Sequence, residues 1–201
     1  MKNICIFGDS IVAGHDAEKN GAWVDLLKTH LLKNPQLNSQ VFNLGVSGDT
    51  SEEILARFES EAKENSANTI ILSCGLNDSM LLASTGKNQV IIEDFLSNIE
   101  KIFNLCQQNT YQLIITGLLP VDEKKTRPIP WHIDGSYINT EISRYNKILE
   151  EFCTKNKIMF VDLFGFLSID LAYLASLEDG VHPNSLGHDK IFRIIMSNIW
   201  K

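Results

Sequence analysis

Four short segments of the sequence carry the residue types that acyl-transfer chemistry uses. Each follows a strand-like apolar run or precedes the last helical stretch. Together they supply a hydroxyl, a histidine base, a carboxylate to orient that base, and amide donors, which are the groups that a serine needs to attack an ester. In chain order they are Gly8-Asp9-Ser10, Val46-Ser47-Gly48-Asp49, Gly75-Leu76-Asn77-Asp78 and Asp179-Gly180-Val181-His182.

Ser10 is the predicted nucleophile. It follows a strand-like run and a glycine, Gly8, that permits a tight turn, so its hydroxyl is expected at the exposed tip of the strand. The alternative is a turn serine that caps the next helix, which is the commoner role of an isolated Gly-Asp-Ser.

His182 is the predicted base, and Asp179 lies three residues before it. Gly180 allows the backbone between them to fold, so that the carboxylate reaches the imidazole Nδ1. Nε2 is then free to take the proton of Ser10. The alternative is a helix-entry loop with an exposed histidine, which is common for an isolated Asp-x-x-His.

Two further residues offer hydrogen-bond donors. The backbone N–H of Gly48 needs no side chain, and glycine lets a substrate oxygen approach closely. The Asn77 side chain supplies an amide, so Ser10 N–H, Gly48 N–H and Asn77 would make a three-donor oxyanion hole. The alternatives are a turn glycine and a turn asparagine.

The elements that position these segments alternate between strands and helices. This rhythm predicts a parallel sheet with helices on both faces, and ligands bind such sheets at the carboxyl ends of the strands. Asp49-Thr50-Ser51 predicts one helix N-terminus, and Ser185 is expected to cap the last helix. The expected strands are 4–7, 41–43, 69–73, 113–116 and 158–162, and the expected helices are 22–32, 51–63, 90–106, 138–152 and 191–200.

The segment 118–136 interrupts this rhythm and is too long for a simple connection. It follows a strand, so we expect it to form a wall or lid of the substrate pocket, and the alternative is an inert surface excursion. Trp131 within it is assigned to substrate binding, as are Asp9 and Asp78. Trp131, Met80, Leu81 and Leu82 fit an apolar acyl pocket and a place in the core or wall equally well.

The composition narrows the classes of partner. The chain has 201 residues, which predicts a single domain over residues 1–201, and its net charge of -7 argues against nucleic acid and anionic membranes. No apolar stretch approaches the roughly 20 residues of a transmembrane helix. The four cysteines show no close-paired spacing, so buried free thiols and a cytoplasmic location are expected.

The four segments together resemble the SGNH subgroup of the GDSL-type esterases and acylhydrolases. The order and spacing of the four blocks agree with that subgroup, and Ile11 stands where the family usually has leucine. The blocks read Gly8-Asp9-Ser10-Ile11, Asn43-Leu44-Gly45-Val46-Ser47-Gly48-Asp49-Thr50, Gly75-Leu76-Asn77-Asp78 and Asp179-Gly180-Val181-His182-Pro183-Asn184.

The resemblance implies a flavodoxin-like three-layer α/β/α sandwich with a parallel sheet of about five strands. It implies a cofactor-free serine hydrolase of small carboxylic esters, with Ser10 as nucleophile, His182 as base, Asp179 orienting it, and Gly48 and Asn77 as oxyanion donors. Family members act on short esters, lysophospholipids, acyl thioesters and acetylated sugars, and the sequence does not choose among these.

The alternative is a non-catalytic module of the same fold that binds an acyl or sugar ligand, although every catalytic position is filled. A nucleotide binder would need a glycine-rich phosphate loop, which the sequence lacks. No metal is predicted, since His15, His30 and His132 show no ligand spacing with each other or with the cysteines. His188 has no partnering acid at useful spacing, and Ser47 is expected to be a turn residue.

Overall fold

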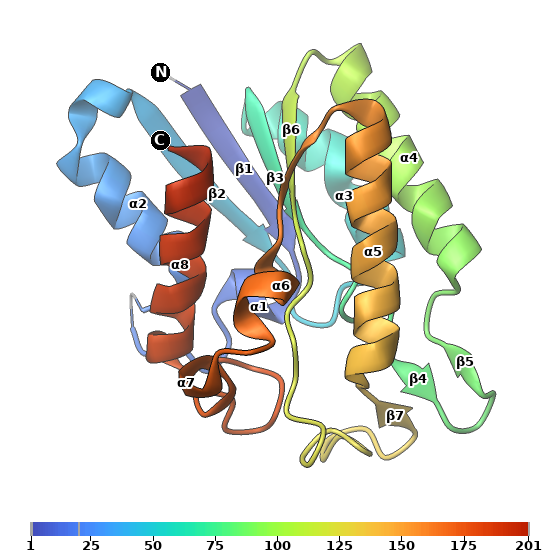
Figure 1. Ribbon diagram of the computed structural model, residues 1–201. Helices are drawn as coiled ribbons and strands as arrows, with labels where there is room; N and C mark the ends of the chain where they lie inside the picture. Colours follow the sequence, from blue (N-terminus) through green and yellow to red (C-terminus); the bar gives the residue numbers. More distant parts are fainter. Residues whose placement is uncertain (1, 20, 201) are drawn as a thin grey trace.

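The computed structural model describes residues 2–19 and 21–200, and a five-stranded parallel sheet lies at its centre (Figure 1). The strand order is β2-β1-β3-β6-β8, and every neighbouring pair is parallel. These results confirm the predicted sheet. The strands are β1 (Lys2–Gly8), β2 (Ser39–Gly45), β3 (Thr69–Ser73), β6 (Gln112–Thr116) and β8 (Met159–Val161).

The central strands are apolar on both faces because helices cover both sides of the sheet. In β1, Ile4 to Phe7 are all buried, and in β3, Thr69 to Leu72 are buried. The register places Ile71 of β3 beside Ile6 of β1 and Ile114 of β6. These side chains form the middle of the core.

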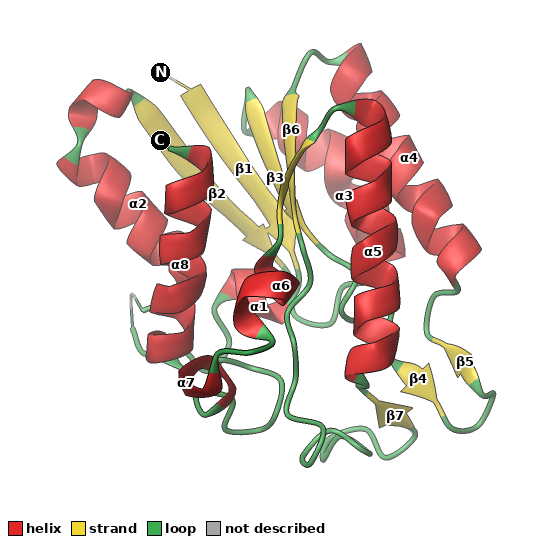
Figure 2. Ribbon diagram, viewed as in Figure 1, coloured by secondary structure: helices red, strands yellow, loops and turns green. Residues whose placement is uncertain are grey.

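Within the described residues, five long helices make the two outer layers (Figure 2). The connection from β1 to β2 runs in the opposite direction from the other three crossovers, so right-handed crossovers place α2 on the face opposite α3, α4 and α5. The contacts of α2 with α8, of α3 with α4, and of α4 with α5 agree with this arrangement. The helices are α2 (Trp23–Lys33), α3 (Ser51–Glu64), α4 (Ile92–Gln108), α5 (Asn139–Asn156) and α8 (Ser185–Ile199).

The predicted helices match these within a few residues, except at the start of α8. The helix begins at Ser185 rather than residue 191, and its cap is Asn184, whose side chain accepts hydrogen bonds from the N–H groups of Leu186 and Gly187. The prediction that Ser185 caps this helix is therefore wrong. At α3, Thr50 is the cap and forms a capping box with Glu53, as the Asp49-Thr50-Ser51 sequence indicates.

Several short elements lie at the carboxyl edge of the sheet and were not predicted (Figure 1). A small antiparallel sheet of order β5-β4-β7 anchors the end of the long 118–136 segment, since Leu82 of β4 pairs with Gly135 of β7. The short elements are α1 (Ser10–Ala13), β4 (Leu81–Leu82), β5 (Lys87–Asn88), β7 (Gly135–Ser136), α6 (Leu163–Leu167) and α7 (Leu171–Leu174).

All four cysteines are buried free thiols, as predicted. Cys5 lies in β1 and Cys106 in α4, and burial raises the pKa of the Cys5 thiol to about 11 and of the Cys106 thiol to about 12. Over residues 2–19 and 21–200, none of the helices combines the length and apolar character that crossing a membrane would need.

Candidate active site

Ser10 is held at the tip of β1 by a one-turn helix. The Asp9 carboxylate accepts a hydrogen bond from Ile11 N–H at 3.0 Å, which caps α1 directly after the strand. The helix also packs tightly on the neighbouring strand, because a Cβ at Gly45 would lie 2.3 Å from Ala13 N. Glycine is therefore needed there, and the backbone of Ser10 has little freedom to move.

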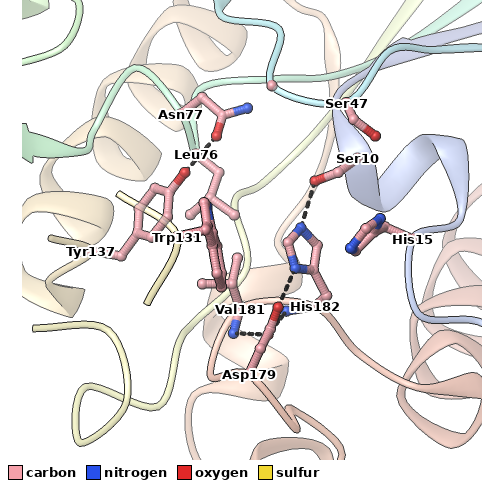
Figure 3. A pocket seen from close by; sticks show the side chains of 11 residues that line it. Ser10, His15, Ser47, Leu76, Asn77, Trp131, Tyr137, Asp179, Val181 and His182 are labelled. Atoms are coloured by element: carbon pink, nitrogen blue, oxygen red, sulfur yellow. Dashed lines mark hydrogen bonds and ion pairs between the residues drawn. The ribbon is translucent and has the colours of Figure 1, made fainter. Parts of the chain in front are cut away.

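The side chains of Ser10, His182 and Asp179 form one hydrogen-bonded line (Figure 3). Ser10 Oγ lies 2.8 Å from His182 Nε2, and His182 Nδ1 lies 2.5 Å from Asp179 Oδ2. A carboxylate can only accept, so Nδ1 carries the proton of the neutral ring and Nε2 accepts from the serine hydroxyl. The structure thus brings together the three residues predicted for catalysis.

The loop between Asp179 and His182 is fixed by the same carboxylate. Asp179 Oδ1 accepts from the backbone N–H groups of Val181 and His182, each at 2.8 Å. Gly180, which directly follows Asp179, has a φ of +94°. Burial alone would raise the pKa of Asp179, but the hydrogen bonds from His182 and Val181 outweigh it and lower the pKa to about 2. Asp179 is therefore ionised throughout the neutral pH range.

The three predicted oxyanion donors lie beside this line. Gly48 has a φ of +88°, and a Cβ placed on it would meet nothing within 4 Å. Within the part of the chain that the structure describes, neither Ser10 N–H nor Gly48 N–H donates to another protein group. The backbone at both positions is thus open to a bound molecule.

The Asn77 side chain is oriented from both ends. Its Nδ2 donates to the Asp49 carbonyl at 2.9 Å, and its Oδ1 accepts from the Tyr137 hydroxyl at 2.5 Å. These two partners fix the orientation of the amide, because the nitrogen must donate and the oxygen must accept. Tyr137 is a site residue that the sequence reasoning missed, because nothing local to it indicates a contact with a residue 60 positions away.

These groups line a cavity of about 490 Å³ at the carboxyl edge of the sheet (Figure 3). Its walls combine the polar groups above with apolar side chains, and the Trp131 and His182 ring centroids lie 5.6 Å apart. The segment 118–136 thus contributes to the wall of the cavity through Trp131, as predicted. The lining residues are Ser10, His15, Ser47, Gly48, Leu76, Asn77, Trp131, Tyr137, Asp179, Val181 and His182.

Asp9 and Asp78, assigned to substrate binding from the sequence, do not line this cavity. Both are buried, at 5% and 0% exposure, and both bind backbone instead. Asp78 accepts from Ser51 N–H at 3.1 Å and from the Ser51 hydroxyl at 2.5 Å, so it ties its own segment to the start of α3. The assignment of these two carboxylates is corrected from substrate contact to support of the site.

Other sequence expectations are also resolved by position. Met80 is buried in the core, and Leu81 and Leu82 form β4, so none of the three lines the cavity. His188 is fully buried, its Nδ1 accepts from Trp23 N–H, and burial lowers its pKa to about 4. Ser47 lies in a turn, as predicted, and also lines the cavity.

The family comparison agrees with this geometry. The family model of the GDSL-like lipase/acylhydrolases matches residues 4–195. The chain belongs to this family.

Curated relatives of this GDSL-like chain are distant. It is 24% identical to thioesterase 1/protease 1/lysophospholipase L1 of Escherichia coli over 90% of the chain and 75% of that protein. It is 25% identical to the uncharacterized lipoprotein YqeF of Bacillus subtilis over 61% of the chain, and the match spans 50% of that lipoprotein.

Solved structures share the GDSL fold along almost the whole chain. The lipase/acylhydrolase from Enterococcus faecalis superposes with a TM-score of 0.79 at 21% identity, covering 99% of this chain and 95% of that one. The acetyl xylan esterase AlAXEase gives a TM-score of 0.77 at 18% identity, covering 98% and 99%. These structures confirm the predicted fold class.

The burial of Asp78 generates a prediction about stability. Burial raises the pKa of its carboxyl from 3.8 to about 7. The group therefore contributes stability that is fully present below about pH 4 and is lost as the pH rises through about 7. Asp78→Asn carries no such proton, so its free energy of unfolding should depend less on pH, by at most about 1.4 kcal/mol per pH unit.

The measurement is urea unfolding of the wild type and of Asp78→Asn at intervals from pH 5 to pH 8. Asp94→Asn, which removes an exposed carboxylate on α4, is the matched control and should keep the wild-type slope. An equal slope in wild type and Asp78→Asn would show that Asp78 is ionised in the folded chain throughout this range.

Proposed function

We propose that the protein is a serine hydrolase of carboxylic esters that works through an acyl-enzyme on Ser10. The observation that carries this proposal is the line of hydrogen bonds from Ser10 through His182 to Asp179, which ends in an open cavity. Membership in the GDSL-like lipase/acylhydrolase family supports the same chemistry.

In this mechanism Ser10 Oγ attacks the acyl carbon while His182 Nε2 takes the hydroxyl proton. The ionised Asp179 carboxylate stabilises the imidazolium that forms and holds its orientation. The substrate oxygen, now negatively charged, receives hydrogen bonds from Ser10 N–H, Gly48 N–H and Asn77 Nδ2. The imidazolium then protonates the leaving alcohol. Water next attacks the acyl carbon while His182 takes its proton, and the acid leaves as His182 returns that proton to Ser10 Oγ.

The geometry also supports an assignment of the two sides of the ester. The leaving alcohol must lie next to His182 Nε2, because that atom gives it a proton. Trp131 and His15 flank the His182 ring, with centroid distances of 5.6 Å and 4.3 Å. We therefore place the alcohol part of the substrate, rather than the acyl chain, against Trp131.

The names of the relatives suggest two kinds of substrate. One kind is lysophospholipids and thioesters, and the other is acetylated xylan. An aromatic wall on the alcohol side suits a ring-bearing alcohol such as a sugar. The single domain over residues 1–201, the absence of nucleic-acid partners and the cytoplasmic location stay predictions.

The first prediction concerns the nucleophile. Ser10→Ala should lower the hydrolysis of p-nitrophenyl acetate, butyrate and octanoate by at least about a thousandfold, because the attacking oxygen is gone. Ser47→Ala, which removes the other serine hydroxyl of the cavity, is the matched control and should stay within about tenfold of wild type.

A fluorophosphonate probe adds a second readout of the same variants. Wild type and Ser47→Ala should be labelled and Ser10→Ala should not, because the probe reacts only with an activated serine. If wild type and Ser10→Ala both hydrolyse these esters only at the background rate, and the probe labels neither, the result would favour the non-catalytic binding module.

The second prediction concerns the oxyanion donors. Asn77→Ala should lower kcat by roughly 10²–10³. Tyr137→Phe removes one hydrogen bond to Asn77 and should lower kcat by up to about tenfold, since such a bond contributes about 0.5–1.5 kcal/mol. KM should change little in either variant.

The double variant Asn77→Ala/Tyr137→Phe distinguishes positioning from direct action. If Tyr137 acts through Asn77, the double variant should have the kcat of Asn77→Ala alone. Additive losses would show that Tyr137 has a separate role in the reaction.

The third prediction concerns Trp131. Trp131→Ala should lower kcat/KM for acetate esters of aryl or sugar alcohols by about 3- to 10-fold, in line with about 0.5–1.5 kcal/mol for an aromatic contact. Methyl and ethyl acetate should be affected less than about twofold. A loss that instead grows with the length of the acyl chain would put Trp131 on the acyl side.

A further inference from the structure

Three potential ligand groups meet at the mouth of the cavity, beside the catalytic histidine. One donor atom from each of His15, Asp16 and His182 lies within 4.8 Å of the other two, and His15 and Asp16 are exposed. The His15 and His182 rings lie 4.3 Å apart, and His15 Nε2 lies 3.4 Å from Asp16 Oδ1. Sequence spacing does not indicate this cluster, because His182 lies more than 160 residues from His15 and Asp16.

The backbone holds His15 in this place. The N–H groups of Gly14 and His15 both donate to the Ser10 carbonyl at 2.9 Å. Gly14 has a φ of +92°, which ends α1 and turns the chain back over the cavity. His15 is therefore tied to the same helical turn that carries the nucleophile, and it lies on the side of His182 opposite Trp131 (Figure 3).

We propose that His15, Asp16 and His182 bind a zinc-type divalent cation, and that this cation inhibits the enzyme reversibly. Two imidazoles and one carboxylate match the ligands that zinc, nickel and copper ions take in proteins. Magnesium and calcium prefer sites built from oxygen alone, so they fit this set poorly.

The partner of His182 favours the role of metal ligand. Metal-bound histidines commonly donate their second ring N–H to a carboxylate, which fixes the ring and raises its basicity. Asp179 accepts from Nδ1 at 2.5 Å, so Nε2 is the nitrogen left to bind a cation. Ligand atoms around one tetrahedral zinc lie roughly 3.3 Å apart. The exposed His15 and Asp16 side chains can close that remaining gap by rotation.

Inhibition follows from the atom that the cation occupies. Nε2 of His182 accepts the hydrogen bond of Ser10 Oγ and, in the proposed reaction, takes its proton. A cation on that lone pair leaves no base for the serine. No covalent bond of the protein is made or broken, so a chelator should restore activity fully. The inhibition rests on the proposed function, whereas the binding of the cation does not.

The experiment is a titration of untagged protein with zinc chloride. Isothermal calorimetry measures binding, and hydrolysis of p-nitrophenyl acetate, relative to each variant's own metal-free rate, measures inhibition. Wild type should bind one zinc ion per chain and lose activity over the same concentrations. EDTA should reverse the loss, and magnesium at equal concentration should neither bind nor inhibit.

The variants locate the site. His15→Ala and Asp16→Asn should each weaken zinc binding and inhibition by at least about tenfold. His30→Ala is the matched control, since His30 lies on α2 and does not line the cavity that holds His182. Ser10→Ala should bind zinc at least as tightly as wild type, because Oγ no longer competes for Nε2.

The outcomes separate this inference from the proposed function. Zinc binding that depends on His15 in a protein that hydrolyses no ester would support the metal site and overturn the serine hydrolase. Hydrolysis that depends on Ser10 but is insensitive to zinc would do the reverse. Zinc affinity that is equal in wild type, His15→Ala and Asp16→Asn would overturn the metal site.

Discussion

Parallel strands end at one edge of their sheet, and the whole site depends on that constraint. β1 delivers Ser10 to this edge, the turn after β2 delivers Gly48, and the turn after β3 delivers Asn77. β1 is the middle strand of these three, so Ser10 lies between the two segments that carry Gly48 and Asn77. His182 arrives from the other end of the chain, through the connection between β8 and α8. These residues therefore all lie at the same edge of the sheet.

Buried carboxylates then hold the segments at the strand tips in place. Asp9 caps the helical turn that carries Ser10, and Asp78 binds the first residue of α3, which directly follows the Gly48 turn. Burial raises the pKa of Asp9 to about 6 and of Asp78 to about 7, so both are held in surroundings that disfavour their charged forms. Their hydrogen bonds to backbone N–H groups offset part of that penalty. The site is thus supported by groups that are themselves costly to bury.

The sequence predicted the elements and the four segments that local patterns carry, and it missed contacts made by residues outside those segments. The strand-helix rhythm predicted the sheet and the edge at which ligands bind. The four segments predicted the candidate site residues, because each segment is a run of neighbouring residues. Asp9 and Asp78 were misassigned because a carboxylate in a motif gives no indication of whether it faces the cavity or the backbone below it. Tyr137 and His15 were missed because their contacts are made through a long loop and a left-handed turn, which periodicity does not describe.

The demands on a catalytic base and on a metal ligand are similar at the level of one imidazole. Both need a fixed ring with a proton on Nδ1 and a free lone pair on Nε2, and the Asp179 carboxylate holds the His182 ring and its Nδ1 proton. The two roles differ in the groups that surround Nε2. Ser10 Oγ lies 2.8 Å from Nε2, which is the contact of the proposed base, and His15 and Asp16 nearby would make Nε2 part of the proposed metal site. In the proposed metal site, the exposed side chains of His15 and Asp16 would regulate the enzyme without any change to the residues that react.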